Sequence, residues 1–198
     1  MFDTSPQSQF KALQRMLGFT IIELMMTLAV AAVLVTIAIP SFRSMIISNN
    51  IITHTNEFVG TISYARSEAI RRGKSVTICK SSSGTACLTG GGTYWDSGWI
   101  AHIDLDSDGT VDANEVLRVW PKLPDTYTLR SSEFTDLLRY NPLGTANNSG
   151  SFAICHNSSE QGAKAIIITP MRPRLGEDSD NNQIPENDSG EINSCESP

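Results

Sequence analysis

The strongest pattern in the sequence is an uncharged apolar run near the N-terminus. From Leu24 to Phe42 no residue is charged, and most are Leu, Ile, Val, Ala or Met. A helix rises about 1.5 Å per residue, so this run comes close to crossing a hydrocarbon core of roughly 30 Å. The pattern therefore predicts a membrane helix over residues 19–42.

The helical pattern continues beyond this run and becomes amphipathic. Apolar residues recur at helical spacings while most charged residues fall elsewhere on the helical wheel. The apolar set is Phe42, Met45, Ile46, Phe58, Ile62, Ala65, Ala69 and Ile70. Gly73 ends the pattern. We therefore expect an amphipathic helix over residues 43–73 whose apolar face packs against another part of the protein.

After Gly73 the pattern changes to short β-prone runs separated by turn residues. The runs are "KSVTICK", "GWIAHIDL", "EVLRVWP", "TYTLRSS", "LLRYNPLG", "SFAICHN" and "KAIIITP". They predict an antiparallel β domain over residues 74–198, which ends in an acidic tail and covers the apolar face of the helix. The expected fold class is α+β, with a long N-terminal transmembrane helix packed on a C-terminal antiparallel β domain.

Composition adds limits on size and chemistry. The chain has 198 residues and a formal net charge of −6, which fits one small domain behind the long helix. The three histidines are scattered, at His54, His102 and His156. No serine-nucleophile elbow or phosphate-binding loop occurs, so we expect no enzymatic activity. The three tryptophans have strand spacing and are expected in or beside the core: Trp95, Trp99 and Trp120.

One carboxylate, Glu23, lies at the start of the apolar run. A charged side chain deep in a membrane helix costs a few kcal/mol, which calls for either water or a partner. Glu23 is the fifth residue counted from Phe19, which follows Gly18, and the apolar helix behind it contains Pro40. This arrangement resembles the class III signal of type IV pilins and pseudopilins.

The resemblance implies a set of processing and assembly steps. A prepilin peptidase would remove the leader, residues 1–18, by cleaving after Gly18, and the new amine of Phe19 would be methylated. The Glu23 carboxylate would meet the terminal amine of a neighbouring subunit, because two charges too costly to bury singly are tolerable as a pair.

The flanks of the apolar run predict orientation. Lys11 and Arg15 precede it and suggest a cytoplasmic start. No small-x-small cleavage pattern follows it, so the segment is expected to stay in the mature protein. We expect a single-pass protein of the bacterial inner membrane with a periplasmic β domain, which becomes extracellular after assembly into a filament.

The body of the chain has a more specific resemblance. The order "YARSEAIRRGKSVTIC" followed by "GWIAHIDLDSDG" resembles the GspH/FimT branch, in which one long helix leads into a compact β domain of two sheets. The resemblance implies a minor pilin or pseudopilin of a type IV filament machine, acting in pilus assembly, filament initiation or at the tip. Its partners would be other pilins, the prepilin peptidase and inner-membrane lipid. The alternatives are a GspH-like pseudopilin of type II secretion and a DNA-binding receptor for natural transformation.

The four cysteines lie in the region expected outside the cytoplasm. Three disulfide connectivities are open, and we favour Cys79–Cys87, which brackets a hairpin-sized segment, with Cys155–Cys195, which ties the tail to a core strand. Zinc is disfavoured because no two cysteines have the close spacing of a zinc knuckle.

An acidic stretch, "DLDSDGTVDANE", has the spacing of an EF-hand loop. Its candidate calcium ligands are Asp104, Asp106, Asp108, Thr110, Asp112 and Glu115. An EF-hand needs an entering helix, whereas "GWIAHI" is typical of a strand. Calcium binding and a plain acidic turn therefore both stay open. For a second acidic stretch, which begins at Glu177, we expect a solvated tail.

A basic segment suggests DNA as a further partner. Some FimT-like proteins of the branch that this chain resembles bind DNA through a Gly-Arg-x-Arg motif. The corresponding segment here, "MRPR", has Met171 where that motif has Gly. Arg172 and Arg174 would contact phosphates with help from Lys164. Two arginines before an acidic tail supply few counterion-releasing contacts. The other interpretation is that these arginines cap a strand end or pair with the tail.

Overall fold

The computed structural model describes residues 18–90, 92–106, 111–112, 114–192 and 194–196. The chain divides into two compact units, residues 1–43 and 44–198. Helix α1 (Ile21–Arg72) contributes residues to both. Of the expected leader, only Gly18 falls within the described residues.

In the first unit, α1 carries apolar side chains that the described chain does not cover. Leu28 and Ile37 are 62% and 67% exposed, and the most apolar 18-residue window is 0% buried. The helix continues through Pro40, which lies inside it. By length and composition, α1 can cross a membrane.

In the second unit, one face of α1 is buried. The buried residues recur at helical spacing: Ile51, Thr55, Phe58, Thr61, Ile62, Ala65 and Ala69. Four residues of the predicted apolar face are exposed instead: Phe42, Met45, Ile46 and Ile70. The prediction was wrong there because the buried face begins only at Ile51, and Ile70 lies one residue beyond it. Gly73 ends the helix with a φ of +64°, a conformation that suits glycine.

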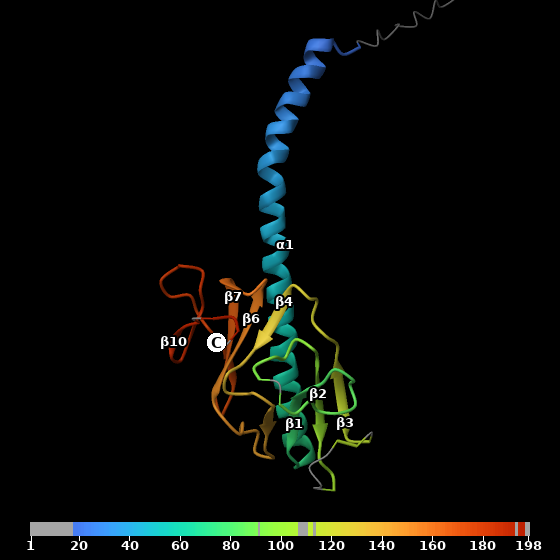
Figure 1. Ribbon diagram of the computed structural model, residues 1–198, viewed down its shortest axis with the longest axis vertical. Helices are drawn as coiled ribbons and strands as arrows, with labels where there is room; N and C mark the ends of the chain where they lie inside the picture. Colours follow the sequence, from blue (N-terminus) through green and yellow to red (C-terminus); the bar gives the residue numbers. More distant parts are fainter. Residues whose placement is uncertain (1–17, 91, 107–110, 113, 193, 197–198) are drawn as a thin grey trace, which may run out of the picture. The chain divides into compact units, whose positions relative to one another are not determined.

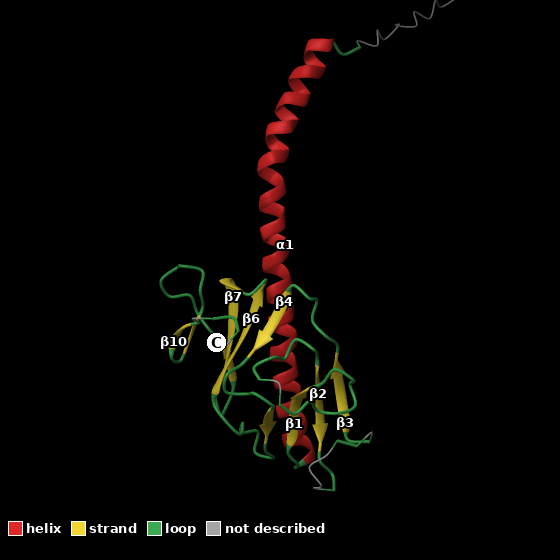
Figure 2. Ribbon diagram, viewed as in Figure 1, coloured by secondary structure: helices red, strands yellow, loops and turns green. Residues whose placement is uncertain are grey.

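The strands form two four-stranded antiparallel sheets and one hairpin. Strands β1 (Val76–Lys80), β2 (Trp99–Ile103), β3 (Val116–Trp120) and β5 (Leu137–Tyr140) form the first sheet in the order β3-β2-β1-β5. Strands β4 (Tyr127–Arg130), β6 (Gly150–His156), β7 (Ser159–Ile168) and β8 (Pro173–Leu175) form the second in the order β4-β6-β7-β8. Strands β9 (Glu186–Asn187) and β10 (Gly190–Glu191) form the hairpin. In the second unit, strands of both sheets lie along α1 (Figures 1 and 2).

The core of the second unit is aromatic and centres on α1. The ring of Phe58 contacts Trp95, Trp99 and Phe152, with ring centroids 6.0, 5.2 and 4.7 Å away. The indole N–H of Trp99 donates to Thr61 Oγ1 at 3.1 Å. Trp120 is 6% exposed, so all three tryptophans lie in the core, as the sequence predicts. These contacts hold both sheets to the helix and confirm the α+β class.

The C-terminal segment forms a smaller second core rather than the solvated tail that we expected. Ile192 and Cys195 are 2% and 1% exposed and cluster with alanines of β6 and β7. Gly176 permits the close approach, because a Cβ there would lie 2.3 Å from the carbonyl oxygen of Glu186. The expectation was wrong because the few apolar residues among the acidic ones are those that reach the sheet.

Candidate functional site

The region around Glu23 is built by the first turn of α1. Thr20 Oγ1 accepts a hydrogen bond from the backbone N–H of Glu23 at 3.2 Å. Thr20 and Glu23 have the spacing of a capping box. The positive end of the helix dipole also stabilises a carboxylate in the first turn. The sequence contained this capping signal, which we did not use. Glu23 is therefore an exposed carboxylate at a helix start, directly before the uncovered apolar surface.

The predicted cleavage position lies immediately before this turn. Gly18 and Phe19 are both exposed and precede the helix, and Phe19 is 84% exposed. No described residue covers either one. This arrangement leaves the bond between them open to an enzyme.

The acidic turn lies between β2 and β3, where an EF-hand would have helices. Asp104, Asp106 and Glu115 bring one carboxylate oxygen each to within 4.8 Å of one another. Glu115 is 1% exposed, and its two oxygens accept backbone N–H groups of Leu105 at 2.5 Å and Asp112 at 3.1 Å. Asp108 and Thr110 lie outside the described residues. Glu115 thus closes the turn, and calcium binding stays a prediction.

The basic segment lies at β8. Arg174 forms an ion pair with Asp188, and the Arg172 side chain is exposed. Arg174 pairs with Ile167 across the ladder, whereas Lys164 lies three residues from Ile167 along β7. Because side chains alternate along a strand, Lys164 and Arg174 belong to opposite faces of the sheet. The structure therefore does not bring the three predicted DNA contacts together.

Both disulfides follow the connectivity that the sequence favours. Cys79 is joined to Cys87 and Cys155 to Cys195, with Cα–Cα distances of 5.5 and 6.2 Å. The first closes the loop that directly follows β1, from Cys79 within that strand. The second ties the C-terminal segment to β6.

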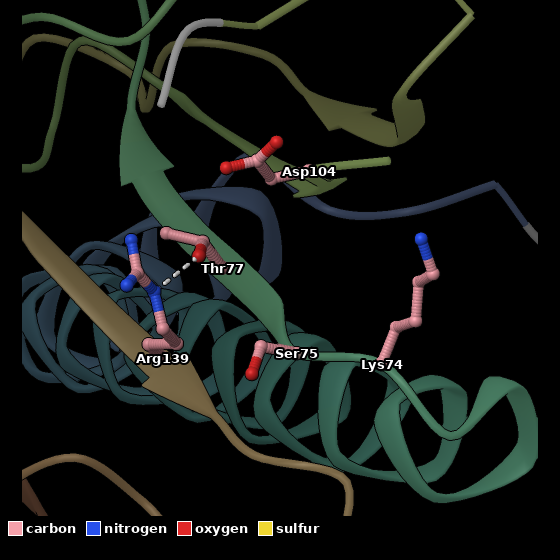
Figure 3. Close-up of a pocket in the computed structure, with 5 residues that line it drawn as sticks. All are labelled: Lys74, Ser75, Thr77, Asp104 and Arg139. Atoms are coloured by element: carbon pink, nitrogen blue, oxygen red, sulfur yellow. Dashed lines mark hydrogen bonds between the residues drawn. The ribbon is translucent and has the colours of Figure 1, made fainter. Parts of the chain in front are cut away.

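The sequence did not reveal a polar cluster on the first sheet. Arg139 Nε donates to Thr77 Oγ1 at 2.9 Å, and Lys74 Nζ donates to the Leu105 carbonyl at 3.0 Å. Lys74, Thr77 and Arg139 line a hollow of ≈ 300 Å³ together with Ser75 and Asp104 (Figure 3). Sequence reasoning missed this hollow because its residues lie in or next to three strands, β1, β2 and β5, whose register is known only in the fold.

His102 lies beside this cluster. It is 6% exposed, and its Nε2 lies 3.5 Å from Cys87 Sγ. Burial lowers the pKa of His102 below its ordinary value of 6.5, and the nearby Glu115 carboxylate offsets only part of that effect. His102 is therefore neutral at pH 7.

A long N-terminal helix packed on antiparallel sheets is the architecture of the pilin-like class. Within that class, the family model described as "Type II transport protein GspH" matches residues 54–171. The chain belongs to this family, which confirms the resemblance found in the sequence.

Solved structures agree on the fold. Two crystal structures of the type IV minor pilin FimU from Pseudomonas aeruginosa strain PAO1 are similar to this chain. The first is 22% identical with a TM-score of 0.54, and the match covers 74% of this chain and 96% of that one. The second is 23% identical with a TM-score of 0.50, and the match covers 71% and 95%. No curated protein matches the chain.

Proposed function

We propose that this chain is a minor pilin or pseudopilin subunit of a type IV filament machine, acting in filament initiation or at the tip. The observation that carries the proposal is the uncovered apolar part of α1 with Glu23 at its start. Such a surface needs lipid before assembly and other helices afterwards. Membership of the GspH family suggests a structural rather than an enzymatic role.

The mechanism is assembly through the N-terminal helix. Lipid of the inner membrane holds residues 19–42, with the β domain on the periplasmic side. A prepilin peptidase cleaves after Gly18, and the Phe19 amine is then methylated. In the filament, the Glu23 carboxylate pairs with the terminal amine of a neighbouring subunit, which offsets the cost of placing either charge among apolar helices.

The first test reads both the processing and the assembly step. Mass spectrometry of the mature chain is expected to find methylated Phe19 at its start. Glu23→Ala and Glu23→Gln are expected to stay in the membrane and be lost from sheared filaments. Glu57→Ala, on the second part of the same helix, is the matched control and is expected to assemble normally.

A different N-terminus, or normal assembly of both Glu23 variants, would refute the proposal. Loss of the control as well would mean that filaments fail for a reason other than the Glu23 charge.

The alternative within the same machine class is type II secretion. The family description names type II transport, whereas the solved relatives are minor pilins of a type IV pilus. We favour the pilus, and deletion of the gene in its host separates the two. A pilus subunit predicts fewer surface pili with normal protein secretion, whereas the opposite result assigns the chain to secretion.

A further inference from the structure

The outer face of the first sheet carries a polar row beside an apolar one. Thr77 pairs with His102 on one side and with Arg139 on the other. In the next row Cys79 pairs with Ile100 and Leu137 in the same way. Directly paired residues share a face, and Val76 and Ile78 of β1 belong to the core on the other face. The two rows therefore lie together on the face turned away from the core.

Two adjoining hollows follow these rows. The apolar one, of ≈ 380 Å³, is lined by the Cys79–Cys87 disulfide, Leu88, Val111 and Leu137. The polar one is the hollow of Figure 3, lined by Lys74, Ser75 and Asp104. Thr77 and Arg139 line both. One ligand can therefore reach an apolar and a cationic environment at once.

Arg139 is oriented for an anion at the junction of the hollows. Its Nε is fixed by Thr77, and within the described part of the chain its two terminal nitrogens have no hydrogen-bond partner. A guanidinium held in this way presents a planar pair of donors that matches a carboxylate. Lys74 adds a second positive charge to the polar hollow.

His102 supplies a neutral wall of the apolar hollow. It lines that hollow, and its Nε2 lies 3.5 Å from the disulfide sulfur of Cys87. Its Nδ1 is enclosed by the protein and has no hydrogen-bond partner among the described residues. His102 therefore adds no charge that would compete with Arg139 for an anion.

We propose that this face binds the C-terminal residue of a peptide chain that ends in an apolar side chain. The terminal carboxylate lies at the free nitrogens of Arg139. The apolar side chain lies over the Cys79–Cys87 disulfide. This binding is separate from assembly through α1 and does not depend on the proposed function.

The carboxylates around the hollows limit the charge of the ligand. Asp104 lines the polar hollow and Asp136 the apolar one. Asp136 accepts the backbone N–H of Gly90 at 3.0 Å and lies 3.7 Å from Lys80 Nζ. Two negative groups at the edges disfavour a ligand with several negative charges. A peptide end with one carboxylate fits this balance, whereas a phosphate or an oligonucleotide does not.

The test uses the full chain in phosphatidylcholine nanodiscs. The probe is the tripeptide Gly-Ala-Leu with a fluorophore on its amine and a free carboxylate, and binding is read by fluorescence anisotropy. The same peptide with an amidated C-terminus is the matched ligand control. We expect amidation to weaken binding about tenfold or more, because the charge-assisted hydrogen bonds to Arg139 are lost.

Two variants locate the site. Arg139→Gln is expected to weaken binding of the free-carboxylate peptide about tenfold and to make the two peptides bind alike. Lys122→Gln removes an exposed cation outside the two hollows and is expected to leave binding within about twofold. Thermal unfolding of each variant checks that it is folded.

Three results would each overturn the proposal. They are equal binding of the two peptides, unchanged binding by folded Arg139→Gln, and no binding of the probe at millimolar concentration.

Discussion

The two parts of α1 belong to one continuous helix, yet they differ in burial. Residues 51–69 bury one face against both sheets, with Phe58 fully buried in an aromatic cluster. None of residues 21–43 is buried, and Leu28 is 62% exposed. The chain therefore completes one part of the helix by itself and leaves the other for lipid or partners. The sequence already distinguishes the two, because no residue from Leu24 to Phe42 is charged, whereas the second part is amphipathic.

The largest expected effect tests this contrast directly. Phe58→Ala is expected to lower the free energy of unfolding of residues 44–198 by about 3–5 kcal/mol, because it removes a buried ring at the centre of the core. Leu28→Ala removes a large apolar side chain from the uncovered part and is expected to change it by less than about 0.5 kcal/mol. Urea unfolding in detergent, followed by tryptophan fluorescence, measures both.

The contrast fails if both substitutions destabilise the second unit equally. That result would mean that residues 21–43 are covered by the rest of the chain. If Phe58→Ala lowers the free energy of unfolding only slightly and leaves its dependence on urea concentration unchanged, the aromatic core contributes little to stability.

The two disulfides extend the comparison to the outer faces of the two sheets. Cys155–Cys195 has a sequence separation of 40 and holds the cover of the second sheet, whereas Cys79–Cys87 has a separation of 8. In the chain-entropy model, loss of the longer loop costs about 4 kcal/mol and loss of the shorter one about 2.5 kcal/mol. We expect Cys155→Ala/Cys195→Ala to lower the urea midpoint more than Cys79→Ala/Cys87→Ala.

The reverse order would show that the Cys79–Cys87 disulfide stabilises the fold by more than loop closure. Hydrogen exchange separates the two cases. Loss of the longer disulfide should raise exchange in residues 176–196 and leave β1 and β2 protected.

Calcium addition tests whether the chain alone stabilises the acidic turn or whether a bound ion does so. Glu115 has both oxygens paired with backbone N–H groups, whereas Asp106 is exposed. The calcium hypothesis predicts that excess Ca²⁺ after EDTA stabilises the fold, by about 2.7 kcal/mol at a hundredfold excess over Kd. Asp106→Asn should reduce this gain, and differential scanning calorimetry measures it. An unchanged melting curve would leave Glu115 as the closure of a plain acidic turn.

His102 gives a smaller effect with a defined pH dependence. Its pKa is lowered in the folded state by burial, so on acidification from about pH 6.5 the unfolded chain binds a proton first. Stability is therefore unaffected above that pH and falls below it, by up to about 1.4 kcal/mol per pH unit, until the folded-state pKa is reached. His102→Gln should flatten the profile below about pH 6.5, and identical slopes would contradict the assignment.

The sequence predicted the elements of this molecule better than its surfaces. The apolar run, Gly73 and the alternating runs define α1 and the main strands, because these signals are local. Strands β8, β9 and β10 were missed, since each is short and lies among polar residues. The row of Arg139, Thr77 and His102 was missed for another reason. Its members are far apart in sequence, and only the register of β1 with β2 and β5 brings them together.

The smallest expected effect concerns Arg172 and Arg174. Within this one segment, the chain supplies an ion-pair partner for one arginine and leaves the other exposed. Arg174 is already paired with Asp188, whereas Arg172 is exposed. The DNA hypothesis predicts that Arg172→Gln/Arg174→Gln weakens retardation of duplex DNA in a gel shift at low salt, because each phosphate contact releases a counterion. Lys122→Gln removes one cation elsewhere and serves as the control for each single arginine variant, and Asp188→Asn should strengthen binding by freeing Arg174. Retardation that is unchanged in the double variant would show that these arginines serve the fold and the acidic segment rather than DNA.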